Sequence, residues 1–462
     1  MRHTVVVVVA LALASFAARA AEPPAFAPSY VAGTRDAGGH VMGGTEIRNL
    51  VVHDGKLFAA NGYWKDTAGF GGSPGAQILV LDAAATPWRI DHAFGETLSD
   101  GRRRHLAISA LSEVTFRTDG RGSPLSARAA VLLASTWDVT GRRTVFARDD
   151  RTGEWPGTVL AEDRSSPGFL PQIRSFGFHR DRSSGIDLAF AGDTDGIFSG
   201  SYDPGLPGHV RWLRTPELAT DGLGSDAFPG LTGRLRISSF AEAGGRLFAA
   251  IGQQVWVRQD GAAPRWQRLY TNPSPHYSQT GLRGLTAVSE PGTSEFLLAA
   301  VEGNQSRIVR IDPATGAEAT DLDLGNLLDA AWTTRVSYVI AAYNDMARVA
   351  RSAGGDDLLI GLEAFIPPKA PRPPGHTVLD VVHGLEAGAW FLIRHPGGRY
   401  ELRRVDAQFP GIGQDLVAAR TIVASPFSGE RGAIYVGGYD ANDSPAHDTA
   451  WIARGFPDRD AR

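Results

Sequence analysis

The segment LFAANG, Leu57–Gly62, is a short apolar strand that ends in small residues, and the same type of segment recurs along the chain. The further copies are AVLLAS from Ala130, LAFAGD from Leu188, LFAAIG from Leu247, LLAAVEG from Leu297, LLIGLE from Leu358 and IYVGGYD from Ile434. Seven copies at a mean period of about 58 residues indicate a repeat architecture, in which each unit buries its apolar surface against its neighbours.

Each copy has strand-like neighbours on both sides. Upstream lie segments such as Glu46–His53 and Gln172–His179, and downstream lie segments such as Ile78–Trp88 and Val255–Trp266. The downstream segments pass through turns rich in Asp, Gly and Pro, and an aromatic residue then starts a further strand. We therefore predict four antiparallel strands in each unit.

Four-stranded units repeated in this way resemble the blades of β-propellers, in the broad sense of Kelch-like and WD40-like proteins, over residues 45–455. The resemblance implies an all-β fold, a single seven-bladed β-propeller of four-stranded antiparallel blades. Six or eight blades stay open as alternatives. The sixth unit is the reason, because a proline-rich stretch, Pro367–Pro374, interrupts it and Thr377–Leu385 has the pattern of a separate strand.

The last unit provides only three strands before the C-terminal tail, residues 456–462. We expect the N-terminal segment, residues 21–44, to supply the fourth strand from about Phe26 to Thr34, because this pairing removes both free sheet edges. The alternative is a last blade of three strands.

Residues 1–20 have the pattern of a signal peptide. Arg2 and His3 precede an apolar run, Val5–Ala14, and Ala18-Arg19-Ala20 is a small-x-small cleavage site. The run is too short to span a bilayer, which takes about 20 residues. Lysine is rare and arginine abundant, as in proteins of bacteria with GC-rich genomes. We predict a periplasmic or secreted bacterial protein, cleaved near Ala20 and without a membrane span.

Composition excludes several classes of partner and cofactor. A formal net charge of -4 argues against a nucleic-acid partner, and 43% apolar residues indicate a folded chain. The chain has no cysteine, and its 12 histidines show no zinc-binding spacing. We expect no cofactor and no metal site, with Ca²⁺ held by oxygens of several loops as the one option left open. We expect a monomer.

Arginine recurs near the start of the strand expected to lie innermost in each unit. In propellers this end of the innermost strand faces the mouth of the central channel, so several arginines there would form a site for an anion. The alternative is that each arginine pairs with an acid of a neighbouring blade, such as Glu46, Glu113 or Glu302. The candidates are Arg48, Arg174, Arg236, Arg283, Arg348 and Arg420, with Arg104 as a weaker one.

Polar and aromatic residues follow several of the LFAANG-type strands, on the same expected face. Aromatic rings beside carboxylates are typical of sugar sites. The candidate ligand-binding residues of this kind are Tyr63, Trp64, Asp193, Tyr439 and Asp440.

These patterns favour a binding module that takes an anionic small molecule or an acidic glycan at an arginine-lined channel mouth. One alternative is a propeller hydrolase or lyase that acts on a sugar or lactone, with or without Ca²⁺, and uses carboxylates such as Asp66, Asp193, Asp440 or Glu363. A second alternative is a scaffold for a protein partner, because the fold alone does not choose among these functions.

Overall fold

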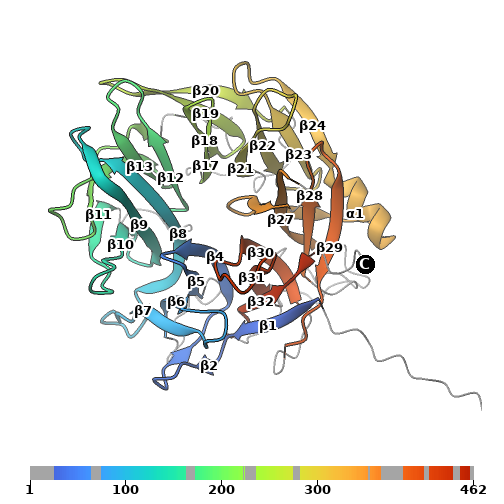
Figure 1. Cartoon of the computed structure of the whole chain (residues 1–462), viewed down its shortest axis with the longest axis horizontal. Coiled ribbons are helices and arrows are strands. Elements are labelled where there is room, and N and C mark those ends of the chain that lie inside the picture. Colours follow the sequence, from blue (N-terminus) through green and yellow to red (C-terminus); the bar gives the residue numbers. More distant parts are fainter. Residues whose placement is uncertain are drawn as a thin grey trace, which may run out of the picture.

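The computed structural model describes residues 25–63, 74–162, 172–221, 223, 236–273, 281–351, 354–365, 389–409, 416–440 and 448–457. Its strands are arranged in a ring around a common centre (Figure 1). The expected all-β propeller class is confirmed. The expected signal peptide and the segment Thr377–Leu385 lie outside the described residues. Among the described residues, no helix is long and apolar enough to cross a membrane.

The described strands form six sheets of four to eight strands and one two-stranded hairpin, and the eight-stranded sheet divides into two groups of four at the single pair Gly62–Ala107 between β5 and β8. This gives seven antiparallel groups of four or five described strands, which we call blades 1 to 7 in the order of their first strands. Blade 1 contains β4 (Glu46–His53), β5 (Lys56–Gly62), β6 (Ala76–Leu81) and β7 (Arg89–Phe94), and blade 2 contains β8 (His105–Thr118), β9 (Pro124–Asp138), β10 (Arg142–Ala147) and β11 (Gly157–Glu162). Blade 3 contains β12 (Ser175–Arg180), β13 (Asp187–Gly192), β14 (Gly196–Tyr202) and β15 (Val210–Trp212), with the short β16 (Leu218–Ala219) beside β14.

The remaining blades follow the same plan. Blade 4 contains β17 (Ile237–Ala243), β18 (Arg246–Ile251), β19 (Gln254–Gln259) and β20 (Arg265–Thr271), and blade 5 contains β21 (Leu282–Val288), β22 (Phe296–Val301), β23 (Arg307–Ile311) and β24 (Glu318–Asp323), followed by α1 (Leu324–Trp332). Blade 6 contains β25 (Tyr338–Ala341), β26 (Ala347–Ala350), β27 (Asp356–Phe365), β28 (Ala389–Arg394) and β29 (Tyr400–Val405). Blade 7 contains β30 (Leu416–Ala424), β31 (Ile434–Asp440), β32 (Trp451–Gly455) and β1 (Phe26–Val31), and β2 (Thr34–Arg35) pairs with β3 (Val41–Met42) in a separate hairpin.

The apolar core is divided among the junctions between blades. The second strands are buried on both faces, as in β22, where all six residues are buried. Small residues let neighbouring sheets approach closely: a Cβ on Gly177 of β12 would lie 2.6 Å from the ring of Phe240 in β17. The described residues form seven apolar clusters, and each joins two adjacent blades. Stability therefore comes from contacts between blades as well as within them.

The ring closes through the two ends of the chain. Strand β1 pairs antiparallel with β32, from Phe26 opposite Gly455 to Val31 opposite Trp451. The carboxylate of Asp406, which follows β29, accepts hydrogen bonds from the backbone N–H groups of Ala25 and Phe26 at 2.9 and 2.8 Å. This pairing gives the last blade its fourth strand and fixes it to blade 6.

The first strand of blade 6 is interrupted. Strands β25 and β26 pair with successive parts of β27, and Ala342–Met346 lie between them outside the ladder. Ala342 has a left-handed backbone, with φ of 52°, which turns the chain out of the strand. Arg348, predicted near the start of an inner strand, lies near the start of β26, ten residues after this interrupted strand begins at Tyr338.

Candidate functional site

Five of the candidate arginines gather at the centre of the ring, and we call Arg48, Arg174, Arg236, Arg283 and Arg420 the central cluster. Each belongs to the first strand of its blade or directly precedes it. The pairing register shifts between Ile47 and Asn49 in β4 and between Ala419 and Thr421 in β30, so Arg48 and Arg420 occupy bulges. In a regular strand, side chains point alternately to the two faces of the sheet, and a bulge changes the direction of the side chain at its position.

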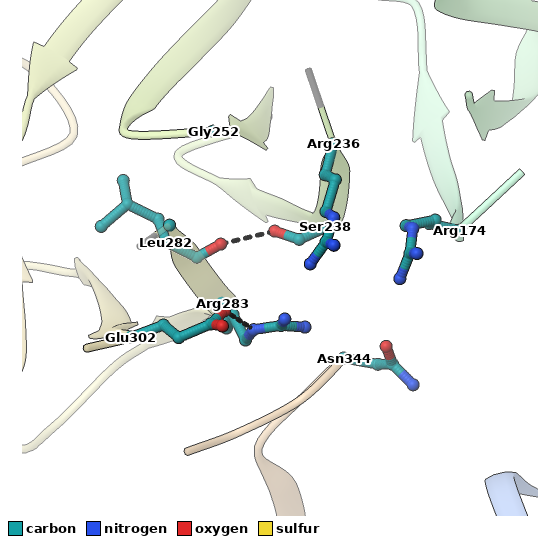
Figure 2. Close-up of a pocket in the computed structure, with 9 residues that line it drawn as sticks. Arg174, Arg236, Ser238, Gly252, Leu282, Arg283, Glu302 and Asn344 are labelled. Atoms are coloured by element: carbon teal, nitrogen blue, oxygen red, sulfur yellow. Dashed lines mark hydrogen bonds and ion pairs between the residues drawn. The ribbon is translucent and has the colours of Figure 1, made fainter. Parts of the chain in front are cut away.

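Three of these arginines line one pocket. Figure 2 shows the guanidinium groups of Arg174, Arg236 and Arg283, from blades 3, 4 and 5, pointing into the space between them, with Asn344 facing them. This space, the central pocket, has a volume of about 20 Å³, which is more than one water molecule needs. The arrangement suits one compact polar group.

Carboxylates hold part of the central cluster in position. Glu302 forms an ion pair with Arg283 and accepts a hydrogen bond from the Tyr338 hydroxyl at 2.6 Å. Glu46 is shared, because its Oε1 lies 2.7 Å from Nε of Arg48 and its Oε2 lies 2.7 Å from Nη1 of Arg420. Of these three pairs, that of Arg420 with Glu46 joins neighbouring blades, as the alternative supposed, whereas Arg48 and Arg283 pair with acids of their own blades.

The electrostatic field is positive around Arg174, whereas at Arg283 burial lowers the pKa but the charge and hydrogen bond of Glu302 outweigh burial and raise it. Burial lowers the pKa of Arg174 well below its ordinary value, and the charges of Arg236, Arg48, Arg283 and Arg420 lower it further. Burial also lowers the pKa of Arg48, to about 10, although Glu46 raises it. A bound anion would favour the charged form of the arginines in the cluster. The cluster should therefore bind a negatively charged ligand in preference to a neutral one.

Two tyrosines and a third carboxylate lie next to the arginines. The hydroxyl of Tyr343 donates a hydrogen bond to buried Glu363 and lies 3.5 Å from the hydroxyl of Tyr439. Arg420 covers the ring of Tyr343 at 4.4 Å from its centre. Burial raises the pKa of Tyr439 well above its usual value, and the charge of Glu363 raises it further. Tyr439 and Glu363, both candidates from the sequence, therefore belong to the same site.

Other candidates lie elsewhere. The buried hydroxyl of Tyr63 donates to Asp448 at 3.1 Å, between blade 1 and the loop before β32. Asp193 is buried against Arg143 at 2.9 Å, and burial raises its pKa to about 6 although Arg143 lowers it. Asp440 is the last residue of β31, and its side chain lies outside the described part, as do Trp64 and Asp66.

Two arginines are not part of the central cluster. Arg348 on β26 is nearly half exposed, donates a hydrogen bond to the carbonyl of Ala287 and lies 3.9 Å from Asp356. Arg104 binds Asp138 at 2.9 Å and Glu96 at 2.8 Å. Glu113, considered as a partner for an inner arginine, instead binds His53.

The sequence did not identify Asn344, Tyr343 or Tyr338. All three come from the interrupted strand of blade 6, and Asn344 donates from Nδ2 to the carbonyl of Arg48 at 3.1 Å. Their only sequence signal is an aromatic and polar stretch, SYVIAAYND, directly after a helical segment. Among the described residues, no group of three or more His, Asp or Glu side chains is placed to hold a metal ion.

Comparisons with known proteins find distant structural similarity alone. No protein-family model matches the sequence, and no curated protein sequence matches it significantly. Among solved structures, it is similar to an α-L-arabinofuranosidase from Fusarium graminearum, with 8% identity, 95% of this chain and 99% of that chain covered and a TM-score of 0.42. An α-L-arabinanase from Penicillium chrysogenum gives 9% identity, coverage of 94% and 98% and a TM-score of 0.42. A sialidase from Trypanosoma rangeli gives 12% identity and a TM-score of 0.40, with 93% of this chain aligned to 57% of the sialidase chain.

Proposed function

We propose that this protein binds an anionic small molecule, or the acidic group of a glycan, in the central pocket. The observation that carries the proposal is the convergence of Arg174, Arg236 and Arg283 on one small space. Guanidinium groups donate paired hydrogen bonds that match the oxygens of carboxylate, sulfate and phosphate groups. The periplasmic or secreted location predicted from residues 1–20 stays part of the proposal.

The positive field supports an anion over a neutral ligand. Arg236 has a lowered pKa, first because of burial and then because of the charge of Arg283. Keeping like charges together in a buried place costs free energy, and an anion that binds there repays part of this cost.

The test is a thermal-shift screen of the chain from Ala21 onward with phosphate, sulfate, uronic and sialic acids, neutral sugars, and Ca²⁺ with a chelator control. A ligand that binds only the folded state adds about 2.7 kcal/mol of stability at 100 times its dissociation constant. We expect anions to raise the melting temperature and neutral sugars to leave it unchanged. A screen in which no anion stabilises the protein would overturn the proposal.

A second candidate is hydrolysis of an anionic sugar derivative at the same place. The specific observation is the buried carboxylate of Glu363, which accepts a hydrogen bond from Tyr343 beside Arg420. Such a carboxylate is suited to general acid or base work. If the candidate is right, chromogenic anionic glycosides are turned over by the wild type and not by Glu363→Gln, while Glu363→Gln still binds the anion. Absence of turnover by the wild type would reject hydrolysis of these glycosides and leave binding as the function.

A further inference from the structure

The directions from which the arginines reach the central pocket distinguish between kinds of anion. Arg174, Arg236 and Arg283 come from three successive blades of a ring, so their guanidinium groups approach the pocket from three sides (Figure 2). A carboxylate has two oxygens in one plane, and paired hydrogen bonds to it also lie in that plane. A tetrahedral group bound through one ester oxygen presents three oxygens in three directions, one for each guanidinium.

The size of the pocket sets a second limit. Its volume of about 20 Å³ suits a compact group at the narrow place where the three arginines meet. The ring or chain that carries the head group would extend from this place. This favours a ligand whose negative charge is concentrated in one terminal group.

The charge around the pocket favours more than one negative charge on the ligand. The positive charges of four other arginines act on Arg174, and those of three act on Arg48. Glu302 is held against Arg283 and Tyr338, Glu46 against Arg48 and Arg420, and Glu363 against Tyr343, so three carboxylates stand against the five arginines of the central cluster. A phosphate monoester carries close to two negative charges above its second pKa of about 6, whereas a carboxylate or a sulfate ester carries one.

From this geometry we infer that the head group bound in the central pocket is a phosphate monoester in its dianionic form. The inference rests on the proposed function, since it specifies which anion the same site takes. Asn344 faces the three guanidinium groups across the pocket.

The experiment is calorimetric titration of the full mature chain with four small probes: methyl phosphate, methyl sulfate, acetate and inorganic phosphate. At pH 7.5 we expect methyl phosphate to bind at least tenfold more tightly than methyl sulfate or acetate. Its affinity should fall as the pH is lowered from 7.5 to 5, because the dianion becomes a monoanion, while the affinity for methyl sulfate should change little. Tighter binding of inorganic phosphate than of methyl phosphate would show that the ligand is the free ion and overturn the assignment to an ester.

Failure of the inference and failure of the proposed function give different results. If acetate or methyl sulfate binds as tightly as methyl phosphate, the pocket is an anion site without preference for a dianion and only the inference falls. If none of the four probes binds, the proposed function falls with it. The wild-type pH dependence decides without any variant. The variant Arg236→Met then tests whether the probes bind in the central pocket. Arg348→Met is the matched control, because the side chain of Arg348 on β26 is nearly half exposed.

Discussion

Arg394 of blade 6 and Asp321 of blade 5 form a buried ion pair, with Nε of the arginine 2.7 Å from Oδ2 of the aspartate. The same carboxylate accepts a hydrogen bond from the hydroxyl of Tyr400 at 2.6 Å. Arg148 repeats this arrangement with Asp91 of blade 1 and with the indole N–H of Trp155. Arg258 repeats it again with Glu217, which follows β15 of blade 3, and with Trp266.

This unit of arginine, acid and aromatic residue joins blades 1 and 2, blades 3 and 4, and blades 5 and 6. Histidines reinforce two of these junctions: His53 at the end of β4 lies between Glu113 and Asp150, and His179 at the end of β12 lies between Glu242 and Asp260. We call these units arginine clamps. Other junctions have polar contacts as well: Tyr270 of blade 4 donates to Glu318 of blade 5 at 2.7 Å, and Arg143 of blade 2 pairs with Asp193 of blade 3 at 2.9 Å.

Replacement of Arg394 should make the protein less stable to unfolding. Glu290 would lose its guanidinium partner and Asp321 would keep Arg310 alone, and loss of one member of a buried pair typically costs about 3–5 kcal/mol. We expect Arg394→Met to lower the free energy of unfolding by that amount in chemical denaturation. Arg399→Met is the control, because Arg399 is 67% exposed and should change stability by less than about 0.5 kcal/mol. Equal effects of the two variants would contradict this role.

Stability should depend on pH through His53. Burial lowers its pKa, but hydrogen bonds and charges of Asp150 and Glu113 outweigh burial and raise it to about 9. A histidine whose pKa is higher in the folded state than in the unfolded state stabilises the fold fully below the unfolded value of about 6.5. This stabilisation is lost as the pH rises through about 9.

The difference in unfolding free energy between wild type and His53→Gln should therefore be largest near pH 6, of order 1–3 kcal/mol, and shrink towards pH 10. His40→Gln is a suitable control, because the side chain of His40 is 73% exposed. A difference that stays constant from pH 6 to pH 10 would show that His53 contributes by packing alone.

Arg236→Met should separate ligand binding from stability. The variant should lose the stabilisation by anions, about 2.7 kcal/mol at 100 times the dissociation constant. Without ligand it should be at least as stable as the wild type, because a buried charge that the other arginines repel has been removed. Melting curves with and without anion measure both effects. A variant that is much less stable without ligand would mean that Arg236 mainly supports the fold.

Asp406→Ala should weaken the closure of the ring. Its carboxylate accepts the N–H groups of Ala25 and Phe26 at the start of β1, and loss of these bonds should cost about 1–3 kcal/mol. Hydrogen exchange should accelerate at the amides of β1 and β32 and stay unchanged in β18, on another part of the ring. If hydrogen exchange accelerates equally in all three strands, opening of the ring and global unfolding are a single event.

The features that depend on local sequence pattern were predicted well from the sequence. The second strands follow from apolar residues such as Phe58 and Phe248, and the positions of Arg174 and Arg236 follow from their place just before the first strands. Five of the six main candidate arginines lie together because the repeat itself places them around the same centre.

The positions of several other side chains depend on partners that are distant in the sequence. Tyr63 bonds to Asp448, 385 residues away, and this contact takes its hydroxyl out of the proposed site. Arg348 lies outside the central cluster, after the interruption at Ala342–Met346, which has no signal of its own in the repeat. Asn344 entered the site through the same interruption.

The pairing of β1 with β32 determines how the molecule responds to mechanical load. The two strands are antiparallel, and Phe26 at the start of one lies opposite Gly455 at the end of the other. A force that pulls the chain termini apart acts at one end of this ladder, so its hydrogen bonds break one after another, as in a zipper, and not all at once. Blade 7 should peel open at low force, and the blades joined by the arginine clamps should resist longer.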